Sequence, residues 1–162
     1  MILIIYFDLD GVLRDLCTAT IGRQATSWDE KVDGEGIIDI VNRGKSVLYT
    51  AQPTEYIKVF NEYDFGMTPC IMTRQLDSWK VYTEQWINLW ITQDHYIKFV
   101  GHESKLIYLK EGDLLVEDYP GFEDFSQIAL VDRPYNWDVI ANRRIYKPRD
   151  LFRILDEHLE RC

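Results

Sequence analysis

The chain has 162 residues and a formal net charge of −9, and 46% of its residues are apolar and 14% aromatic. This length suits one domain with a real core, and the composition excludes a disordered acidic tail. No apolar run approaches the roughly 20 residues of a membrane span, and the acidic balance disfavours stable binding along a nucleic-acid backbone.

The first part of the chain combines an apolar strand with an irregular segment. Residues 2–7 form an apolar run that ends at Asp8. No basic segment precedes the run, so we expect a buried strand and not a signal peptide. Residues from approximately 14 to 52 are rich in Thr, Gly and charge, and we expect a small cap inserted after this strand. Apolar spacing predicts short helices over residues 37–41 and 56–60, the second opened by Pro53.

The rest of the chain alternates apolar runs with helical patterns. The runs have strand length without strict alternation, and they cover residues 70–72, 97–100 (the weakest), 114–116 and 128–131. Apolar spacing predicts one helix over 77–91, with Asp77 as its N-cap, and another over 149–159. Alternating strands and helices predict a doubly wound α/β domain with a mainly parallel sheet, buried on both faces. We therefore expect residues 1–162 to form a single domain.

Polar side chains stand at or near the ends of these predicted strands. In a parallel sheet the carboxyl ends share one edge, where ligands bind in doubly wound folds. The residues concerned are Asp8, Asp10, Thr73, Lys105, Glu117 and Asp118. Carboxylates suit Mg²⁺, and a metal with an ionised aspartate is the set that phosphoryl transfer uses. A second carboxylate two residues on can protonate a leaving oxygen and later accept a proton from water.

Two of these assignments have rivals in the sequence. Thr50 follows the apolar residues 47–49 and competes with Thr73 as a hydroxyl at a strand end. Lys110 lies closer than Lys105 to the acidic pair at 117–118. We prefer Thr73, because a long helix, a strand and then a lysine follow it in the expected order. We prefer Lys105, because it begins a helix-like stretch after residues 101–104, where it can point at the strand ends.

Four segments resemble, in the right order, the motifs of haloacid dehalogenase (HAD) superfamily phosphatases. Residues 7–13 (Phe-Asp-Leu-Asp-Gly-Val-Leu) look like the first motif, residues 71–73 the second, Lys105 the third and residues 115–118 the fourth. Residues 112–120 and 131–136, with the Trp-bearing helix after Thr73, are most similar to the 5′(3′)-deoxyribonucleotidase family. The resemblance implies a Rossmann-like three-layer sandwich, a small cap after the first strand, Mg²⁺, and dephosphorylation of nucleoside monophosphates.

The resemblance also implies a role for each matching residue. Asp8 would be the nucleophile and a metal ligand, and Asp10 the general acid and base, with its carbonyl on the metal. Thr73 and Lys105 would hold the phosphate, and Arg74 would meet the substrate or reach solvent. Asp118 would bind the metal, with Glu117 beside it through water.

The predicted function is therefore a Mg²⁺-dependent phosphatase acting on deoxyribonucleoside 5′-monophosphates through an aspartyl-phosphate. Alternatives are a 3′-end polynucleotide phosphatase, a phosphotransferase with the same intermediate, and a non-catalytic HAD-fold binding module. Trp28, Tyr49 and Tyr56 are candidates for stacking on a nucleobase. The three cysteines are scattered without a CxxC pair, which favours the reducing cytoplasm. The oligomeric state stays open.

Overall fold

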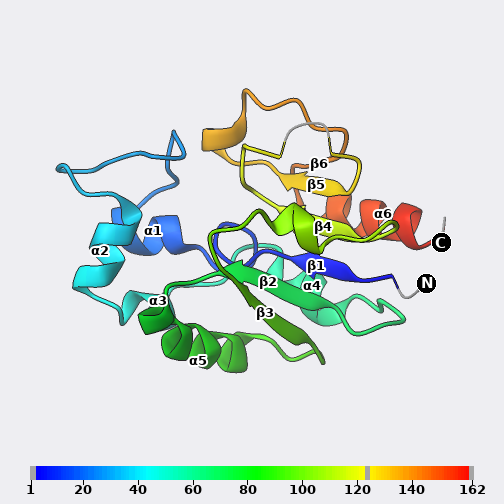
Figure 1. The fold of residues 1–162 in the computed structure, drawn as a ribbon, viewed down its shortest axis with the longest axis horizontal. Coiled ribbons are helices and arrows are strands. Elements are labelled where there is room, and N and C mark those ends of the chain that lie inside the picture. Colours follow the sequence, from blue (N-terminus) through cyan, green and yellow to red (C-terminus); the bar gives the residue numbers. More distant parts are fainter. Residues whose placement is uncertain (1–2, 123–124, 161–162) are drawn as a thin grey trace.

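The computed structural model describes residues 3–122 and 125–160, and it has a single six-stranded sheet (Figure 1). The strands are β1 (Ile5–Phe7), β2 (Cys70–Arg74), β3 (Tyr96–Val100), β4 (Leu114–Glu117), β5 (Ile128–Val131) and β6 (Arg144–Ile145). Their order in the sheet is β3-β2-β1-β4-β5-β6, and every neighbouring pair is parallel. The predicted α/β class is confirmed, and the sheet is parallel throughout. Ile2, expected in the first strand, lies outside the described residues.

Helices cover one face of this sheet, and a short helix with loops covers the other. The α-helices are α1 (Leu16–Ile21), α2 (Ile37–Arg43), α3 (Val47–Thr50), α4 (Ile57–Glu62), α5 (Lys80–Trp90) and α6 (Pro148–Leu159). The 3₁₀ helices are η1 (Asp77–Trp79), η2 (Lys105–Tyr108) and η3 (Pro134–Asn136). No helix in the described ranges is long and apolar enough to cross a membrane.

The core explains why the strand runs lack alternation. Along β1, Ile5 and Phe7 belong to a cluster with residues of α4, α5 and α6, whereas Tyr6 belongs to a second cluster on the opposite face. Successive strand side chains point to opposite faces, and here both faces are buried. The result is the predicted three-layer arrangement, with η2 and neighbouring loops in the thinner layer.

The segment of residues 14–52, called the cap segment below, leaves the sheet after β1 and returns before α4. Its two ends run side by side, because Thr54 N–H donates to Leu13 O at 2.8 Å and Asp15 N–H donates to Gln52 O at 2.9 Å. Helices α1, α2 and α3 lie in this segment, on the side where the strands end (Figure 1, left). The cap segment thus stands beside the carboxyl edge of the sheet.

Several local predictions were wrong at the ends of elements. Asp77 is not an N-cap: it begins η1, α5 starts only at Lys80, and the Asp77 carboxylate pairs with Lys80 Nζ at 2.7 Å. Pro53 does not open α4, which begins at Ile57, because Pro53 bridges the backbone of Arg14 instead. The elements α1, α3 and β6 were not predicted. Each has six residues or fewer, too short for a clear hydrophobic period.

Candidate active site

The strand order reverses direction between β1 and β4. From β1 the chain moves outward to β2 and β3, and it then returns to β4 on the other side of β1. In open α/β sheets, the crevice at the carboxyl ends of two such strands is the usual ligand site. Asp8 follows β1, Glu117 ends β4, and Asp118 comes next. The topology therefore brings three carboxylates to the position where such folds bind ligands.

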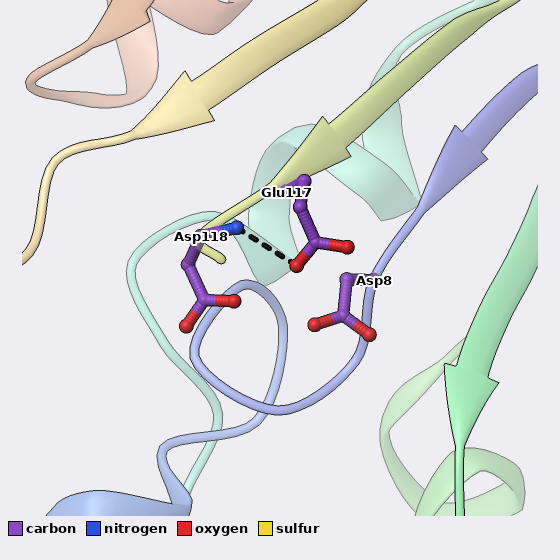
Figure 2. Close-up of side chains that lie close together, drawn as sticks. All are labelled: Asp8, Glu117 and Asp118. Carbon is purple, nitrogen blue, oxygen red and sulfur yellow. Dashed lines mark hydrogen bonds between the residues drawn. The ribbon is translucent and has the colours of Figure 1, made fainter. Parts of the chain in front are cut away.

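The side chains of Asp8, Glu117 and Asp118 lie close together at the carboxyl ends of β1 and β4 (Figure 2). All three residues are buried, and one oxygen of each lies within 4.8 Å of the others. Glu117 Oε1 accepts the backbone N–H groups of Asp118 at 3.0 Å and Tyr119 at 3.2 Å. These bonds fix the Glu117 carboxylate. We call the three residues the acidic triad.

One oxygen of the acidic triad has no partner. Asp118 Oδ1 is a buried side-chain atom without a hydrogen bond, and no other described residue has such an atom. A buried polar atom of this kind is costly unless a ligand satisfies it. Hard carboxylate oxygens are the ligands that Mg²⁺ prefers. The acidic triad therefore fits a divalent metal ion.

The other Asp118 oxygen is held by the residues around it. The hydroxyl of Tyr135 donates to Asp118 Oδ2. A Cβ atom at position 11 would lie 1.9 Å from the same oxygen, and Gly11 has a φ of +85°. Only glycine fits this close approach and this backbone conformation without strain. Gly11 thus serves the placement of Asp118 as well as the turn after Asp8.

Lys105 is the cation that the structure places against the acidic triad. Its Nζ lies 2.6 Å from Asp8 Oδ1 and 2.8 Å from Glu117 Oε2, and the side chain is buried. One ammonium faces three carboxylates, so negative charge is in excess. Lys110, the rival, precedes β4 at the opposite edge of the sheet, where its backbone N–H donates to Asp113 Oδ2 at 2.8 Å.

The pKa values of the triad follow from burial and from this charge excess. Burial and the Glu117 charge raise the pKa of Asp8 to about 8, although Lys105 opposes the shift. Burial, Glu117 and Asp8 raise the pKa of Asp118 well above its ordinary value. Burial also acts to raise the pKa of Glu117, but Lys105 and the Asp118 hydrogen bond outweigh it and lower that pKa. Without a further cation, the folded protein favours a proton on part of the triad.

Thr73 lies near the site, and its rival Thr50 does not share this position. Thr73 is buried in β2, and its Oγ1 accepts a hydrogen bond from Gln75 Nε2 at 2.9 Å. The same Gln75 nitrogen donates to Asp10 Oδ2 at 2.8 Å, so Thr73 and Asp10 are neighbours. Thr50 is exposed at the end of α3, where it donates to Ser46 O at 3.2 Å. The residues before Thr50 form a helix, not a strand.

Arg74 binds backbone carbonyls of a neighbouring loop. Its guanidinium donates to the carbonyls of Gly101 at 2.6 Å, Glu103 at 2.8 Å and His102 at 3.3 Å. Arg74 is exposed, and it fastens the loop between β3 and η2. The contacts therefore assign Arg74 to the loop that directly precedes Lys105.

Sequence reasoning missed Arg14, Gln75 and Tyr135. Arg14 pairs with Asp10, Gln75 joins Asp10 to Thr73, and Tyr135 holds Asp118. A signal existed for Arg14, which is a charged residue next to the apolar Val12 and Leu13. Gln75 and Tyr135 carry no comparable signal, because their partners are distant in the sequence or set by loop geometry.

Replacing Lys105 with methionine is expected to damage both stability and activity. The change leaves Asp8 and Glu117 buried without their cation, which typically costs about 3 kcal/mol or more. If the site carries the phosphatase chemistry that the sequence predicts, the lost donor at developing charge should also lower turnover about 10²–10³-fold. Thermal unfolding and phosphate release measure the two effects. Lys110→Met, at an exposed lysine, is the matched control. If Lys110→Met and not Lys105→Met loses stability and activity, the assignment of Lys105 to the site is wrong.

No protein-family model matches this chain, and no curated protein matches it.

Proposed function

We propose that this protein is a Mg²⁺-dependent phosphatase that hydrolyses nucleoside monophosphates, with deoxyribonucleoside 5′-monophosphates as the favoured substrates. The observation that carries the proposal is the buried acidic triad, with Lys105 against it, at the switch point of a parallel sheet. The resemblance of the four sequence motifs to HAD phosphatases supports the same chemistry.

Each residue of the site has a role in this proposal. An oxygen of Asp8 attacks phosphorus while the bond to the ester oxygen breaks, and Asp10 gives that oxygen a proton. Asp10 then takes a proton from water, whose oxygen attacks phosphorus and releases the Asp8 carboxylate. Thr73 and Lys105 bind the phosphate oxygens. Asp8, the Asp10 carbonyl and Asp118 would hold Mg²⁺, with Glu117 beside it through water, and the ion would supply positive charge that offsets the phosphate.

An aromatic cluster beside the triad supports a nucleotide as the substrate. Trp28, half-exposed in the cap segment, has its ring centroid 4.9 Å from Tyr119 and 5.6 Å from Tyr135. Tyr135 also bonds to Asp118, so the cluster adjoins the acidic triad. Ring faces of this kind stack on a nucleobase. Tyr56 is buried in the core and unsuited to this role, and Tyr49 is exposed on α3 beside residues of α5.

The charge and the cysteines support a small substrate inside a reducing compartment. A net charge of −9 disfavours a polynucleotide substrate. Cys17 and Cys70 are both free thiols in the described part of the chain, as is usual for the cytoplasm.

A substrate panel tests the proposal. We would measure phosphate release with Mg²⁺ from deoxy- and ribonucleoside monophosphates, a 3′-phosphorylated oligonucleotide and an aryl phosphate. Fast release from the mononucleotides is expected. Release from the oligonucleotide alone would assign the protein to end processing, and transfer to an added alcohol would indicate a phosphotransferase. Metal binding with no release from any ester would leave only a binding module.

A further inference from the structure

Arg14 is a fully buried arginine at the base of the cap segment. Its exposed fraction is 0%, and its guanidinium lies 5.7 Å from the ring centre of Trp86 in α5. Nη1 donates to Leu48 O of the cap segment at 2.8 Å and to Thr83 Oγ1 of α5 at 3.2 Å. One side chain therefore joins the cap segment to the helix layer.

The rest of the guanidinium holds Asp10. Nε lies 2.6 Å from Asp10 Oδ1, and Nη2 lies 2.9 Å from Asp10 Oδ2, which is a bidentate fork. Gln75 Nε2 occupies a further position on Oδ2 at 2.8 Å. A carboxylate has about four lone-pair sites, so the arrangement leaves one, on Oδ1. The Asp10 side chain as a whole keeps 24% of its surface exposed, so this carboxylate is not sealed in the core as Arg14 is.

Stability alone does not account for this pair. Removing a guanidinium completely from water is costly, and well-packed apolar residues often replace a buried ion pair without loss of stability. Here Arg14 is fully buried, whereas Asp10, two residues after Asp8 of the acidic triad, is partly exposed. The pair fixes the direction of a carboxylate at the edge of the site, which an apolar residue cannot do.

We infer that Arg14 is a positioning residue for Asp10. It holds the carboxylate so that the free Oδ1 site faces first the ester oxygen and then the attacking water. Because Nη1 also binds Leu48 O and Thr83 Oγ1, this orientation depends on the cap segment being seated against α5. The inference rests on the proposed phosphatase function, in which Asp10 gives a proton to the leaving group.

The test uses two leaving groups with the full-length protein and Mg²⁺. A nucleoside leaves as an alkoxide and needs a proton, whereas p-nitrophenolate leaves without one. In Arg14→Lys we expect kcat/KM for the best mononucleotide to fall about 10–100-fold, within the usual contribution of general acid catalysis. For p-nitrophenyl phosphate we expect a fall of less than about threefold, because kcat/KM reports the first half-reaction. Equal losses for both esters would make Arg14 merely structural and overturn the inference.

A double-mutant cycle adds a second criterion. If Arg14 acts through Asp10, Arg14→Lys is expected to cause no further loss for the mononucleotide in an Asp10→Asn background. If the losses of activity in the two single variants multiply in the double variant, Arg14 does not act through Asp10. Tyr63→Phe removes a hydrogen bond to Asp156 in the α4–α6 contact and is the control for a general loss of stability. The ratio of its kcat/KM values for the two esters should match that of the wild type.

A second variant covers the case in which Arg14→Lys does not fold. Thr83→Val keeps the side-chain shape but removes the hydroxyl that accepts from Arg14 Nη1 at 3.2 Å and donates to Gln75 Oε1 at 2.9 Å. Because both partners of this hydroxyl hold Asp10, the variant should shift the ratio of the kcat/KM values for the two esters in the same direction by about threefold. An unchanged ratio in folded Thr83→Val would then overturn the inference. Wild-type protein that hydrolyses neither ester would overturn the proposed function as well, so the two failures are distinguishable.

Discussion

Asp8→Asn is expected to lower phosphate release by about 10⁴-fold or more, as removal of a nucleophile does in other enzymes. The amide has nearly the shape of the carboxylate, but it has no anionic oxygen that can attack phosphorus. Asp8 is 8% exposed, directly after β1, and its backbone N–H donates to Val116 O at 2.9 Å. Asparagine keeps that backbone bond, so the loss should come from chemistry and not from the fold.

The stability of Asp8→Asn shows whether the activity is lost through the chemistry or through the fold. Asp8→Asn removes one of three buried carboxylates that repel one another, and Lys105 keeps its contact with Glu117 at 2.8 Å. We therefore expect the thermal unfolding midpoint to stay close to that of the wild type. Asp113→Asn is the matched control, because Asp113 is buried at the opposite edge and accepts Ile4 N–H at 2.8 Å. Asp113→Asn should lose stability and keep turnover. If Asp8→Asn remains active, the covalent mechanism through Asp8 is wrong.

Much of the site could be predicted because a parallel sheet places the carboxyl ends of its strands at one edge. Once the runs at 5–7 and 114–117 are strands, Asp8 and the Glu117–Asp118 pair must lie near one another. Lys105 follows β3 on the same edge, which is why the sequence favoured it over Lys110. These inferences need the strand positions and the rule on strand ends, whereas the close approach of Asp8 to Glu117 and Asp118 also depends on the pairing of β1 with β4.

The partners of Asp10 could not be predicted in this way. Asp10 follows β1 as Asp8 does, but it is held by Arg14 and Gln75 and is not part of the acidic triad. The Arg14 position depends on Leu48 in the cap segment and Thr83 in α5. Contacts between irregular segments have no period in the sequence, so the apolar neighbours of Arg14 could suggest that it is buried but not which groups it binds.

Arg74 is a second residue whose contacts could not be predicted from its position in the sequence. Its place directly after Thr73 left contact with the substrate or with solvent open, and Arg74 is the last residue of β2, where the following loop determines the direction of a long side chain. The carbonyls of residues 101–103 accept its hydrogen bonds. The loop conformation, and not the strand position, decides where this guanidinium lies.

The charge excess of the acidic triad makes the response to Mg²⁺ dependent on pH. Burial and Glu117 raise the pKa of Asp8 from 3.8 to about 8, so the folded protein binds a proton that the unfolded chain has already released. Stability of the metal-free protein should therefore fall as pH rises from about 4 to about 8. Metal ligands must be deprotonated, so Mg²⁺ binding becomes tighter over the same range. The stabilisation by Mg²⁺ should thus be larger at about pH 8 than at about pH 5.

Thermal unfolding at both pH values, with EDTA or with Mg²⁺, measures this difference. At a hundredfold excess over Kd, binding contributes about 2.7 kcal/mol, or about 5–10 °C for a chain of this size. EDTA should also stop phosphate release and excess Mg²⁺ restore it. Asp118→Asn, which alters the side chain with the unpartnered oxygen, should lose most of the Mg²⁺ shift, whereas Asp113→Asn should keep it. Release of phosphate in metal-free buffer, or an equal Mg²⁺ shift at both pH values, would show that the acidic triad does not hold the metal as proposed.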